Sequence, residues 1–503
     1  MKNIETIVIT LLTVFLSVII FLLSIKGDAG VPIAYQGADR STVVGGPFES
    51  SGSTSRFALT ESLAENGTVF FSEDLAKFSS PDLVYHNGKY STIFTPGVSF
   101  LGLPFYKLGG IFGMPQVGAY ATVTLFALVN ILLIAAVAKK LGAGMAAGLL
   151  AGVTFAFASN AFSYATTYTQ HVMSSAVLLG ALLIAAAKPN LFFSILLGVL
   201  AGLGLLLDIP NAFMLLPIAI LFIAKHIKIE KKQLKSYLTL KAGFLFVIVG
   251  LVPLLFLYGW YNHEISGSYS TLAQFIGRVD YEDSKLPKLP EKVDAYAEKL
   301  PFSTRILLPG FYTLLLSDER SWLFYSPVLL LGLIGGYLAY KKKETNILAT
   351  TILGVLTINI LLYAMFGDPW GGWAFGPRYL IPGAAMLSVL LAVALQRFAR
   401  NIFFIVGFIG LFLYSALINT VGVLTTTQVP PRHEVIGDSL QIPWTFAYNF
   451  QLFDANRLGS LVYNLFFSSI LSSQVYGGIV IGLVVLLAGF LYMMVIFDEG
   501  RRK

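Results

Sequence analysis

Two arginines in the second half of the chain could bind a phosphate group. Arg378 follows the run Trp-Gly-Gly-Trp-Ala-Phe-Gly-Pro at 370–377, and Arg320 follows an Asp-Glu pair. A guanidinium group can bind a phosphate through two parallel hydrogen bonds, and paired glycines let the backbone approach a ligand closely. A local ion pair would explain Arg320 equally well. We predict that both arginines contact the phosphate of a donor molecule.

The tryptophans beside Arg378 suit a sugar or lipid ligand. Trp370 and Trp373 could stack on a sugar ring or on an isoprenoid chain. A belt of tryptophans at the membrane–water interface explains them equally well. We count both among the candidate substrate-binding residues.

Two polar residues lie at the ends of long apolar runs. Asp208 ends the run 190–207, and a carboxylate costs about 2.5–3.5 kcal/mol near the bilayer centre and less toward the interface. It either caps the helix that follows or is a partner for a cation or a sugar hydroxyl. His171 begins the run 171–187. It either forms an interfacial hydrogen bond or, beside a phosphate, donates to the leaving group. Both are candidate substrate contacts.

The polar segment 26–95 holds further candidates. The hydroxyls of 53–55 can cap a helix that continues through Arg56 and lies along the membrane surface. Asn87-Gly88 is a turn signal, and it precedes Lys89 and Tyr90. Arg56, Lys89 and Tyr90 are the residues of this segment to which the family resemblance described below assigns contact with substrate. The segment also contains five candidate catalytic acids: Asp39, Glu49, Glu61, Asp74 and Asp82. Each of them could instead be a solvated loop acid.

The elements that must position these residues are membrane-spanning helices. Of the 503 residues, 56% are hydrophobic and 12% charged, and the mean hydropathy is +0.75. About 25% of residues are charged in an average soluble domain. A span needs about 20 apolar residues, which predicts about twelve spans. Their approximate limits are 5–25, 115–138, 145–162, 171–187, 190–207, 210–224, 237–258, 322–340, 347–366, 379–396, 402–424 and 476–497.

We therefore predict an all-α polytopic membrane protein with helices in its extracytoplasmic loops. The stretch 96–113 is short and broken by prolines and glycines, so we expect a re-entrant or surface helix there. One unit should comprise residues 1–424, including the outer loops 26–95 and 259–321. Residues 425–503 should add another outer loop and the final span.

Short basic loops predict the orientation. Clusters of Lys and Arg at 139–140, 188, 225–235, 341–343, 397–400 and 501–503 all fall on one side when twelve spans are counted. Such clusters favour the cytoplasmic side. We expect a multi-pass plasma membrane protein with cytoplasmic termini and extracytoplasmic long loops.

The sequence also argues against several classes of protein. It has no cysteine, which excludes disulfides, thiolate metal sites and cysteine nucleophiles. The net charge is +7, but no basic stripe with interleaved aromatics predicts nucleic-acid binding. No phosphate-binding glycine loop, zinc-ligand spacing or serine-hydrolase elbow is present. We expect the lipid bilayer as a partner, no nucleic acid, and we assign no metal ligands.

Three motifs resemble one group of membrane enzymes. The residues Ser-Arg-Phe-Ala-Leu-Thr-Glu-Ser-Leu at 55–63, followed by 87–106, resemble the first outer loop of GT-C glycosyltransferases. They are most similar to the dolichyl-phosphate-mannose protein mannosyltransferases and the bacterial aminoarabinose and lipopolysaccharide-sugar transferases. The runs 321–327 and 370–382 resemble a prokaryotic group placed near these enzymes. The resemblance covers most of the chain by order of elements and implies a GT-C-like domain over 1–424.

One position departs from that pattern. The resemblance implies an acidic pair, which includes the catalytic base, where this chain has Ser53-Thr54. Neither hydroxyl can act as a carboxylate base. The resemblance favours Glu61, because the surface helix would place it near the substrate cleft. Asp74 and Asp82 are further candidates.

The resemblance implies a membrane glycosyltransferase. It would transfer a sugar from a polyprenyl-phosphate donor to a glycan, lipid or protein acceptor outside the cytoplasm. A carboxylate would deprotonate the acceptor hydroxyl, and cations would stabilise the departing phosphate. A divalent metal cofactor is left open. The alternatives are a transporter or flippase of a lipid-linked or small polar substrate and a non-catalytic scaffold with a GT-C-like shape.

Overall fold

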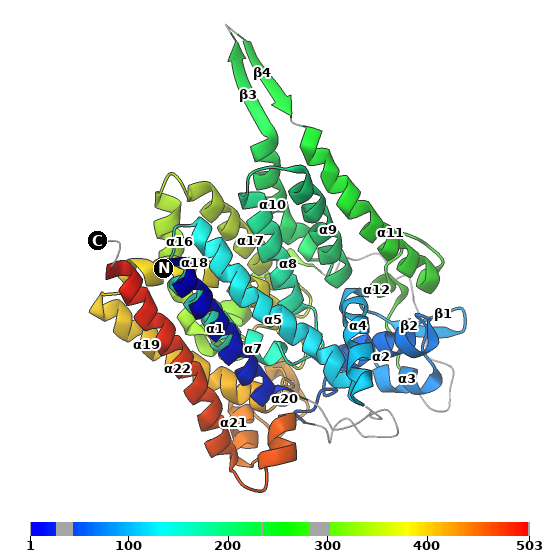
Figure 1. Cartoon of the computed structure of the whole chain (residues 1–503). Helices are drawn as coiled ribbons and strands as arrows, with labels where there is room; N and C mark the ends of the chain where they lie inside the picture. The colour runs from blue at the N-terminus through cyan, green and yellow to red at the C-terminus, as the bar shows by residue number, and fades with distance from the viewer. Residues whose placement is uncertain (1, 27–43, 233–234, 241, 282–301, 501–503) are drawn as a thin grey trace.

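The computed structural model describes residues 2–26, 44–232, 235–240, 242–281 and 302–500. It is 73% helical, and Figure 1 shows a bundle of long helices with shorter elements gathered at its lower end. Among the described residues, seven helices are long and apolar enough to cross a membrane. They are α1 (Lys2–Ser24), α5 (Pro115–Lys140), α11 (Phe246–Ser266), α17 (Asn346–Ala364), α18 (Ile381–Phe398), α19 (Ile402–Leu424) and α22 (Ser473–Gly500).

Shorter apolar helices fall in the other predicted spans. They are α6 (Met145–Phe157), α8 (His171–Ala186), α9 (Leu191–Leu207), α10 (Asn211–His226) and the pair η6 (Pro327–Leu331) and α16 (Gly332–Lys341). Each predicted span therefore contains a helix, and the prediction of an all-α polytopic membrane protein is confirmed.

The span predicted at 237–258 is displaced along the chain. Residues 235–240 form a strand, β4 (Lys235–Leu240), which pairs antiparallel with β3 (Ile227–Lys232). The short helix η3 (Ala242–Leu245) follows, and α11 begins only at Phe246. Apolar and charged residues alternate over the first four residues of β3, Ile-Lys-Ile-Glu, and a two-residue period favours a strand. The resulting hairpin projects from the upper end of the bundle (Figure 1).

At the centre of the bundle, α18 packs against α6 and α8, and all three helices pack against α5. In α18, 83% of the apolar window is buried. Close approach of α5 and α6 depends on two glycines of α6. A Cβ atom added at Gly148 would lie 2.7 Å from the Cα of Ala135, and one at Gly152 would lie 2.7 Å from the carbonyl oxygen of Ile131. Small residues at such spacing are typical of helix packing in membranes.

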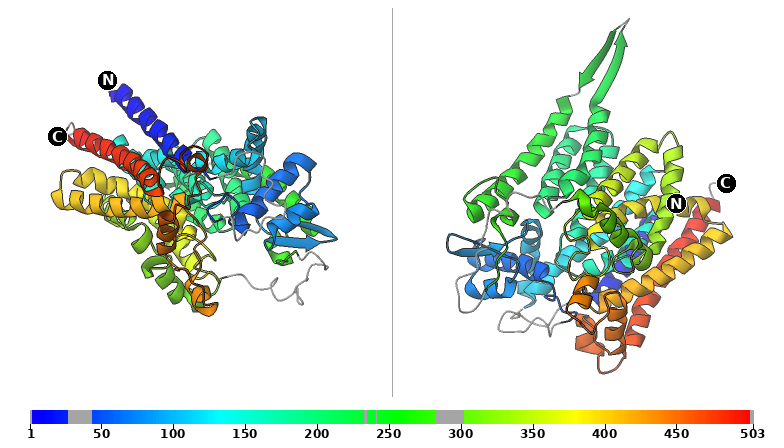
Figure 2. Two further views of the ribbon diagram at one scale, coloured as in Figure 1. Left: turned by 90° about the horizontal axis from the view of Figure 1, so that it is seen from below. Right: turned by 180° about the vertical axis from the view of Figure 1, so that it is seen from behind.

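The helices at the edge of the bundle carry exposed apolar side chains. Only 11% of the apolar window of α11 is buried, which indicates contact with lipid and supports a membrane location. The first and last helices, α1 and α22, pack together, and Figure 2 shows both termini at the same end of the molecule. The cytoplasmic placement of this end stays a prediction, and residues 501–503 lie outside the described residues.

Shorter elements occupy the remaining segments. In chain order they are α2 (Ser51–Glu61), η2 (Ser62–Asn66), α3 (Glu73–Ser79), β1 (Leu83–His86), β2 (Lys89–Thr92), α4 (Gly97–Ile111), α7 (Ala161–Tyr164), α12 (Ala273–Ile276), η4 (Thr304–Ile306), α14 (Leu307–Phe311), η5 (Tyr312–Leu316), α15 (Trp322–Tyr325), η7 (Arg378–Leu380), α20 (Arg432–Gly437), α21 (Ala447–Asp454) and η8 (Tyr463–Phe467). The helix expected within 96–113 is α4. The turn expected at Asn87-Gly88 is also confirmed, since both residues have positive φ and join β1 to β2.

The helix expected around Arg56 exists but differs in two respects. It begins at Ser51 after the N-cap Ser50, so the hydroxyls of 53–55 lie inside α2 rather than capping it. Every residue from Ser53 to Thr60 is buried, and α2 packs against α3 and α4. It is therefore a buried helix, and its position along the membrane surface stays a prediction.

A buried ion pair lies within the first polar segment, and its carboxylate joins that segment to the one after α19. The Nζ of Lys26 lies 3.0 Å from Oε1 of Glu49, and both side chains are almost fully buried. Glu49 also accepts hydrogen bonds from the backbone of Gly45 and Thr427 and from the hydroxyls of Thr426 and Thr427. These contacts give Glu49 a structural role.

Candidate functional site

The glycine-rich loop between α17 and α18 lies directly against Arg378. Gly371 and Gly372 both have positive φ, at 76° and 60°, which reverses the chain. The backbone N–H of Gly371 donates to Oδ1 of Asp368 at 2.9 Å. A Cβ atom at Gly371 would lie only 3.0 Å from Nε of Arg378. The half-buried guanidinium also faces the ring of Tyr379, 5.3 Å from its centre. Nε of Arg378 has no acceptor among the described residues.

Asp208 lies half-buried between the ends of α9 and α10. Its Oδ2 accepts hydrogen bonds from Nε2 of Gln170 at 3.2 Å and from the hydroxyl of Tyr363 at 3.3 Å. Burial raises the pKa of the Asp208 carboxyl, while Gln170, Arg56 and Tyr363 favour the charged form. The ring of Tyr363 stacks on that of Tyr379, with centroids 4.5 Å apart. Two tyrosines therefore connect the carboxylate to the loop of Arg378.

Arg56 completes the group from the first polar segment. It is 4% exposed, its Nη1 donates to the carbonyl oxygen of Gly52 at 2.8 Å, and its guanidinium lies 3.8 Å from the centre of the Phe94 ring. Burial lowers the pKa of Arg56 to about 10, while Asp208 and Asp82 favour its charged form and Arg378 opposes it. Arg56 is thus still a cation at neutral pH.

We call Arg56, Asp208, Tyr363, Arg378 and Tyr379 the arginine–aspartate cluster. Its members come from four distant parts of the chain and interact electrostatically. Two guanidinium groups that lie close enough for their charges to interact can together attract an anion. A carboxylate held beside them can accept a proton. Among the described residues, no group of three or more His, Asp or Glu side chains is arranged to hold a metal ion.

His171 lies against the cluster. Its ring contacts the rings of Tyr164 and Tyr379 edge-on, with centroids 5.8 Å and 5.9 Å away, and it is 4% exposed. The hydroxyl of Tyr164 accepts a hydrogen bond from the backbone N–H of Phe375 at 3.1 Å. His171 therefore helps to hold the wall on which the glycine-rich loop rests.

Arg320 is placed differently from Arg378. Its side chain is fully buried, and its guanidinium donates to the backbone carbonyls of five residues: Glu319, Trp370, Gly372, Val429 and Trp444. These carbonyls belong to the glycine-rich loop, to the segment after α19 and to the residue that precedes Arg320 in the chain. In this geometry Arg320 holds the loops together, and its donors point at backbone oxygens.

The two predicted tryptophans contact α20. The ring of Trp370 packs on His433, with centroids 4.5 Å apart. Nε1 of Trp373 donates to Oε2 of Glu434 at 2.5 Å. The segment after α19 therefore covers this side of the glycine-rich loop.

The candidates of the first polar segment are spread out. Asp82 is an electrostatic neighbour of Arg56 and pairs with Arg278 at 3.2 Å. Asp74 is exposed in the first turn of α3, and Glu61 is the half-buried last residue of α2. Asp39 lies outside the described residues.

Lys89 and Tyr90 belong to β2 and make local aromatic contacts. The Nζ of Lys89 lies 4.4 Å from the centre of the Phe70 ring, and Tyr90 contacts Tyr85 and Tyr281. Within the described part of the chain, no hydrogen bond or ion pair joins Lys89, Tyr90 or Asp74 to the arginine–aspartate cluster.

Sequence reasoning missed four residues of this site. Asp368 and Tyr379 flank the run that drew attention to Arg378, and Gln170 precedes His171, so proximity to these motifs was the available signal. Tyr363 lies inside an apolar span, and nothing in the sequence around it indicates a polar role.

Comparison with known proteins supports the fold. No protein-family model and no curated protein matches the chain. ArnT from Cupriavidus metallidurans bound to undecaprenyl phosphate aligns over 96% of this chain and 75% of its own, with 13% identity and a TM-score of 0.51. Its apo structure gives a TM-score of 0.48 at 14% identity, covering 96% and 74% of the two chains. The Archaeoglobus fulgidus oligosaccharyltransferase tethered to an acceptor peptide gives 0.44 at 14% identity, covering 95% and 55%. The first likeness confirms the fold predicted from the motifs.

Proposed function

We propose that this chain, which has the GT-C fold, is a membrane glycosyltransferase that takes a sugar from a polyprenyl-phosphate donor. The observation that carries the proposal is the electrostatic interaction of the buried Arg56 with both Arg378 and the carboxyl group of Asp208. An anion with a lipid tail suits such a site at one end of a bundle of apolar helices. The undecaprenyl phosphate bound to ArnT is a ligand of this chemical class.

In this proposal Arg378 binds the donor phosphate. Its Nε has no acceptor among the described residues, and a Cβ atom at Gly371 would lie 3.0 Å from it, so the glycine leaves room for the guanidinium. Arg56 adds a second positive charge. During transfer the bond between the anomeric carbon and the phosphate oxygen breaks, and negative charge grows on the phosphate. Cations already in place stabilise that charge without rearrangement.

Asp208 is the base that we favour. The acids expected at Ser53-Thr54 are absent, and both residues there are fully buried. Glu61 lies five residues after Arg56 on α2, a rotation of about 140° around the helix axis, so the two face different sides. Asp208 instead interacts electrostatically with Arg56, and burial raises its pKa. It would take the proton of the acceptor hydroxyl as the acceptor oxygen bonds to the anomeric carbon.

Donor binding and transfer test these roles separately. In purified protein, Arg378→Ala should weaken undecaprenyl phosphate binding by about 10- to 100-fold, as expected for a lost charge-assisted contact. Arg397→Ala, at the other end of α18, is the matched control and should bind normally. Asp208→Asn should bind the donor yet form almost no glycosylated product in membranes supplied with labelled donor. Equal affinities of the two arginine variants would refute the phosphate site, and full transfer by Asp208→Asn would refute the base.

A further inference from the structure

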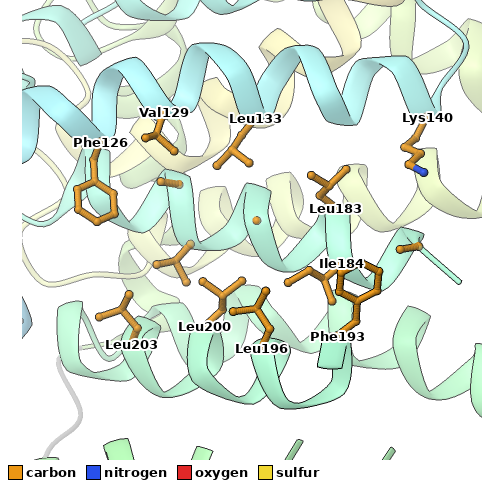
Figure 3. A pocket seen from close by; sticks show the side chains of 14 residues that line it. Phe126, Val129, Leu133, Lys140, Leu183, Ile184, Phe193, Leu196, Leu200 and Leu203 are labelled. Carbon is orange, nitrogen blue, oxygen red and sulfur yellow. The ribbon is translucent and has the colours of Figure 1, made fainter. Parts of the chain in front are cut away.

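A second candidate binding site lies away from the arginine–aspartate cluster. A groove of about 510 Å³ runs between α5 and α9, with α8 as its floor. Figure 3 shows Phe126, Val129 and Leu133 of α5 pointing toward the leucines of α9 across the groove. Its volume falls within the ~300–1,000 Å³ of small-molecule sites, and its lining is almost entirely apolar. A hydrocarbon chain matches this lining.

The groove has the length of one membrane leaflet. On α9 it extends from Leu203 to Phe193, about 15 Å at the rise of an α-helix. The hydrocarbon core of a bilayer is about 30 Å thick. The groove therefore accommodates a chain that enters from one side and reaches the bilayer centre.

Near the end of the groove beside Leu203, α4 packs against both helices that flank the groove. The N-terminus of α4 rests on the end of α9, where a Cβ atom at Gly97 would lie 2.5 Å from the backbone of Leu206 and the hydroxyl of Thr95 donates to the carbonyl oxygen of Leu207. The other end of α4 contacts the start of α5, since a Cβ at Gly109 would lie 2.9 Å from Cα of Gly118. The contacts of α4 thus join α5 to α9 beyond this end of the groove, and Lys140 and Ala187 line the opposite end.

This opposite end carries two lysines. Lys140 lines the groove (Figure 3), and Lys225 lies close enough to Lys140 for the two charges to interact. The Nζ of Lys225 donates to the carbonyl oxygen of Ala187, another residue of the lining, at 3.3 Å. Neither lysine forms an ion pair within the described ranges. Two repelling ammonium groups at the mouth of an apolar groove are complementary to a lipid with an anionic headgroup.

We propose that the groove binds an anionic phospholipid, with one acyl chain between α5 and α9 and its phosphate between Lys140 and Lys225. The predicted orientation places this end of the molecule in the cytoplasmic leaflet, where anionic lipids attract basic residues. The site is independent of the proposed glycosyl transfer, because it faces the opposite end of the bundle from the arginine–aspartate cluster.

Photo-crosslinking in vesicles tests the proposal with the full chain. Phosphatidylglycerol and phosphatidylcholine carrying the same diazirine acyl chain are compared, and labelled peptides are mapped by mass spectrometry. We expect phosphatidylglycerol to label the groove helices at least about fivefold more strongly. The double variant Lys140→Gln/Lys225→Gln should abolish this preference. The control variant Lys139→Gln/Lys188→Gln removes the same amount of charge from neighbouring exposed lysines and should keep the preference for phosphatidylglycerol.

A second variant tests the groove itself. The Cβ direction of Gly180 points at Leu200 across the groove, with 3.3 Å to its Cδ1, so Gly180→Leu should block acyl-chain entry and reduce labelling by both lipids. Equal labelling by the two headgroups, or a preference unaffected by Lys140→Gln/Lys225→Gln, would overturn the proposal. Stronger labelling by a diazirine polyprenyl phosphate than by phosphatidylglycerol would overturn it as well and assign the groove to that lipid.

Discussion

The position of the Arg378 guanidinium can be tested by adding one methyl group to the loop beside it. Gly371→Ala and Gly372→Ala are a matched pair, because both glycines have positive φ and carry a similar backbone cost of about 1–2 kcal/mol for alanine. They differ in what the new methyl meets. At Gly371 it would lie 3.0 Å from Nε of Arg378 and 3.3 Å from Tyr379, whereas at Gly372 the nearest atom is 3.7 Å away.

Only Gly371→Ala therefore displaces the guanidinium. A shift of a few tenths of an ångström at Nε misaligns the planar donor group, and we expect the loss of one hydrogen bond between charged partners, about 1.5–3 kcal/mol. That loss corresponds to a rise of about 10- to 150-fold in the Kd for donor. Gly372→Ala should share the stability cost and keep most of the affinity.

The measurement is a titration of undecaprenyl phosphate against purified wild type and the two variants, with melting temperatures recorded in parallel. Similar melting temperatures with a selective loss of affinity in Gly371→Ala are the expected result. If the two variants bind donor equally well, the guanidinium is not the phosphate contact or its position is not set by Gly371. Either outcome removes the structural basis for assigning Arg378 its role.

Three further predictions follow from buried polar contacts. Arg320→Lys keeps the charge but has only three donors for five carbonyls, so we expect a loss of about 2–4 kcal/mol in unfolding free energy, measured as a lower melting temperature. An unchanged melting temperature would contradict the role of Arg320 in holding the loops together. Glu49→Gln leaves Lys26 buried without its countercharge and should cost about 3–5 kcal/mol, and adding Lys26→Met should restore part of that stability. Tyr363→Phe removes a hydrogen-bond donor that favours the charged form of Asp208, so the pKa of Asp208 should rise further. Because the base acts when deprotonated, the acid limb of the pH–rate profile of transfer should move to higher pH. An acid limb that stays in place would argue against Asp208 as the base.

Much of the fold could be predicted because hydropathy is a local property of the chain. An apolar run of about 20 residues has few alternatives to a spanning helix, since the bilayer offers no partners for exposed backbone groups. The predicted start of one span, at residue 237, is wrong for a local reason. Residues 235–240, which precede α11, form a strand that pairs with β3. The turn at Asn87-Gly88 was equally local.

The candidate site was only partly predictable. Arg378, Asp208 and His171 stood out one by one, because a charge or a polar ring beside an apolar run is costly. Arg56 stood out through the motif that resembles the first outer loop of GT-C glycosyltransferases. The sequence did not show how these residues are arranged relative to one another. It also did not show that Arg320 lies apart from the cluster: its neighbouring acids suggested an ion pair, but its partners are backbone carbonyls.

What the sequence alone determined is the number and place of the apolar helices and a short list of costly polar residues. Only the tertiary structure decided which of these meet: Asp208 comes to Arg56 across about 150 residues, and Tyr363 joins them from inside an apolar helix. The physical reason is that burial in lipid depends on each segment's own composition, whereas contact between distant charges depends on how every helix between them packs.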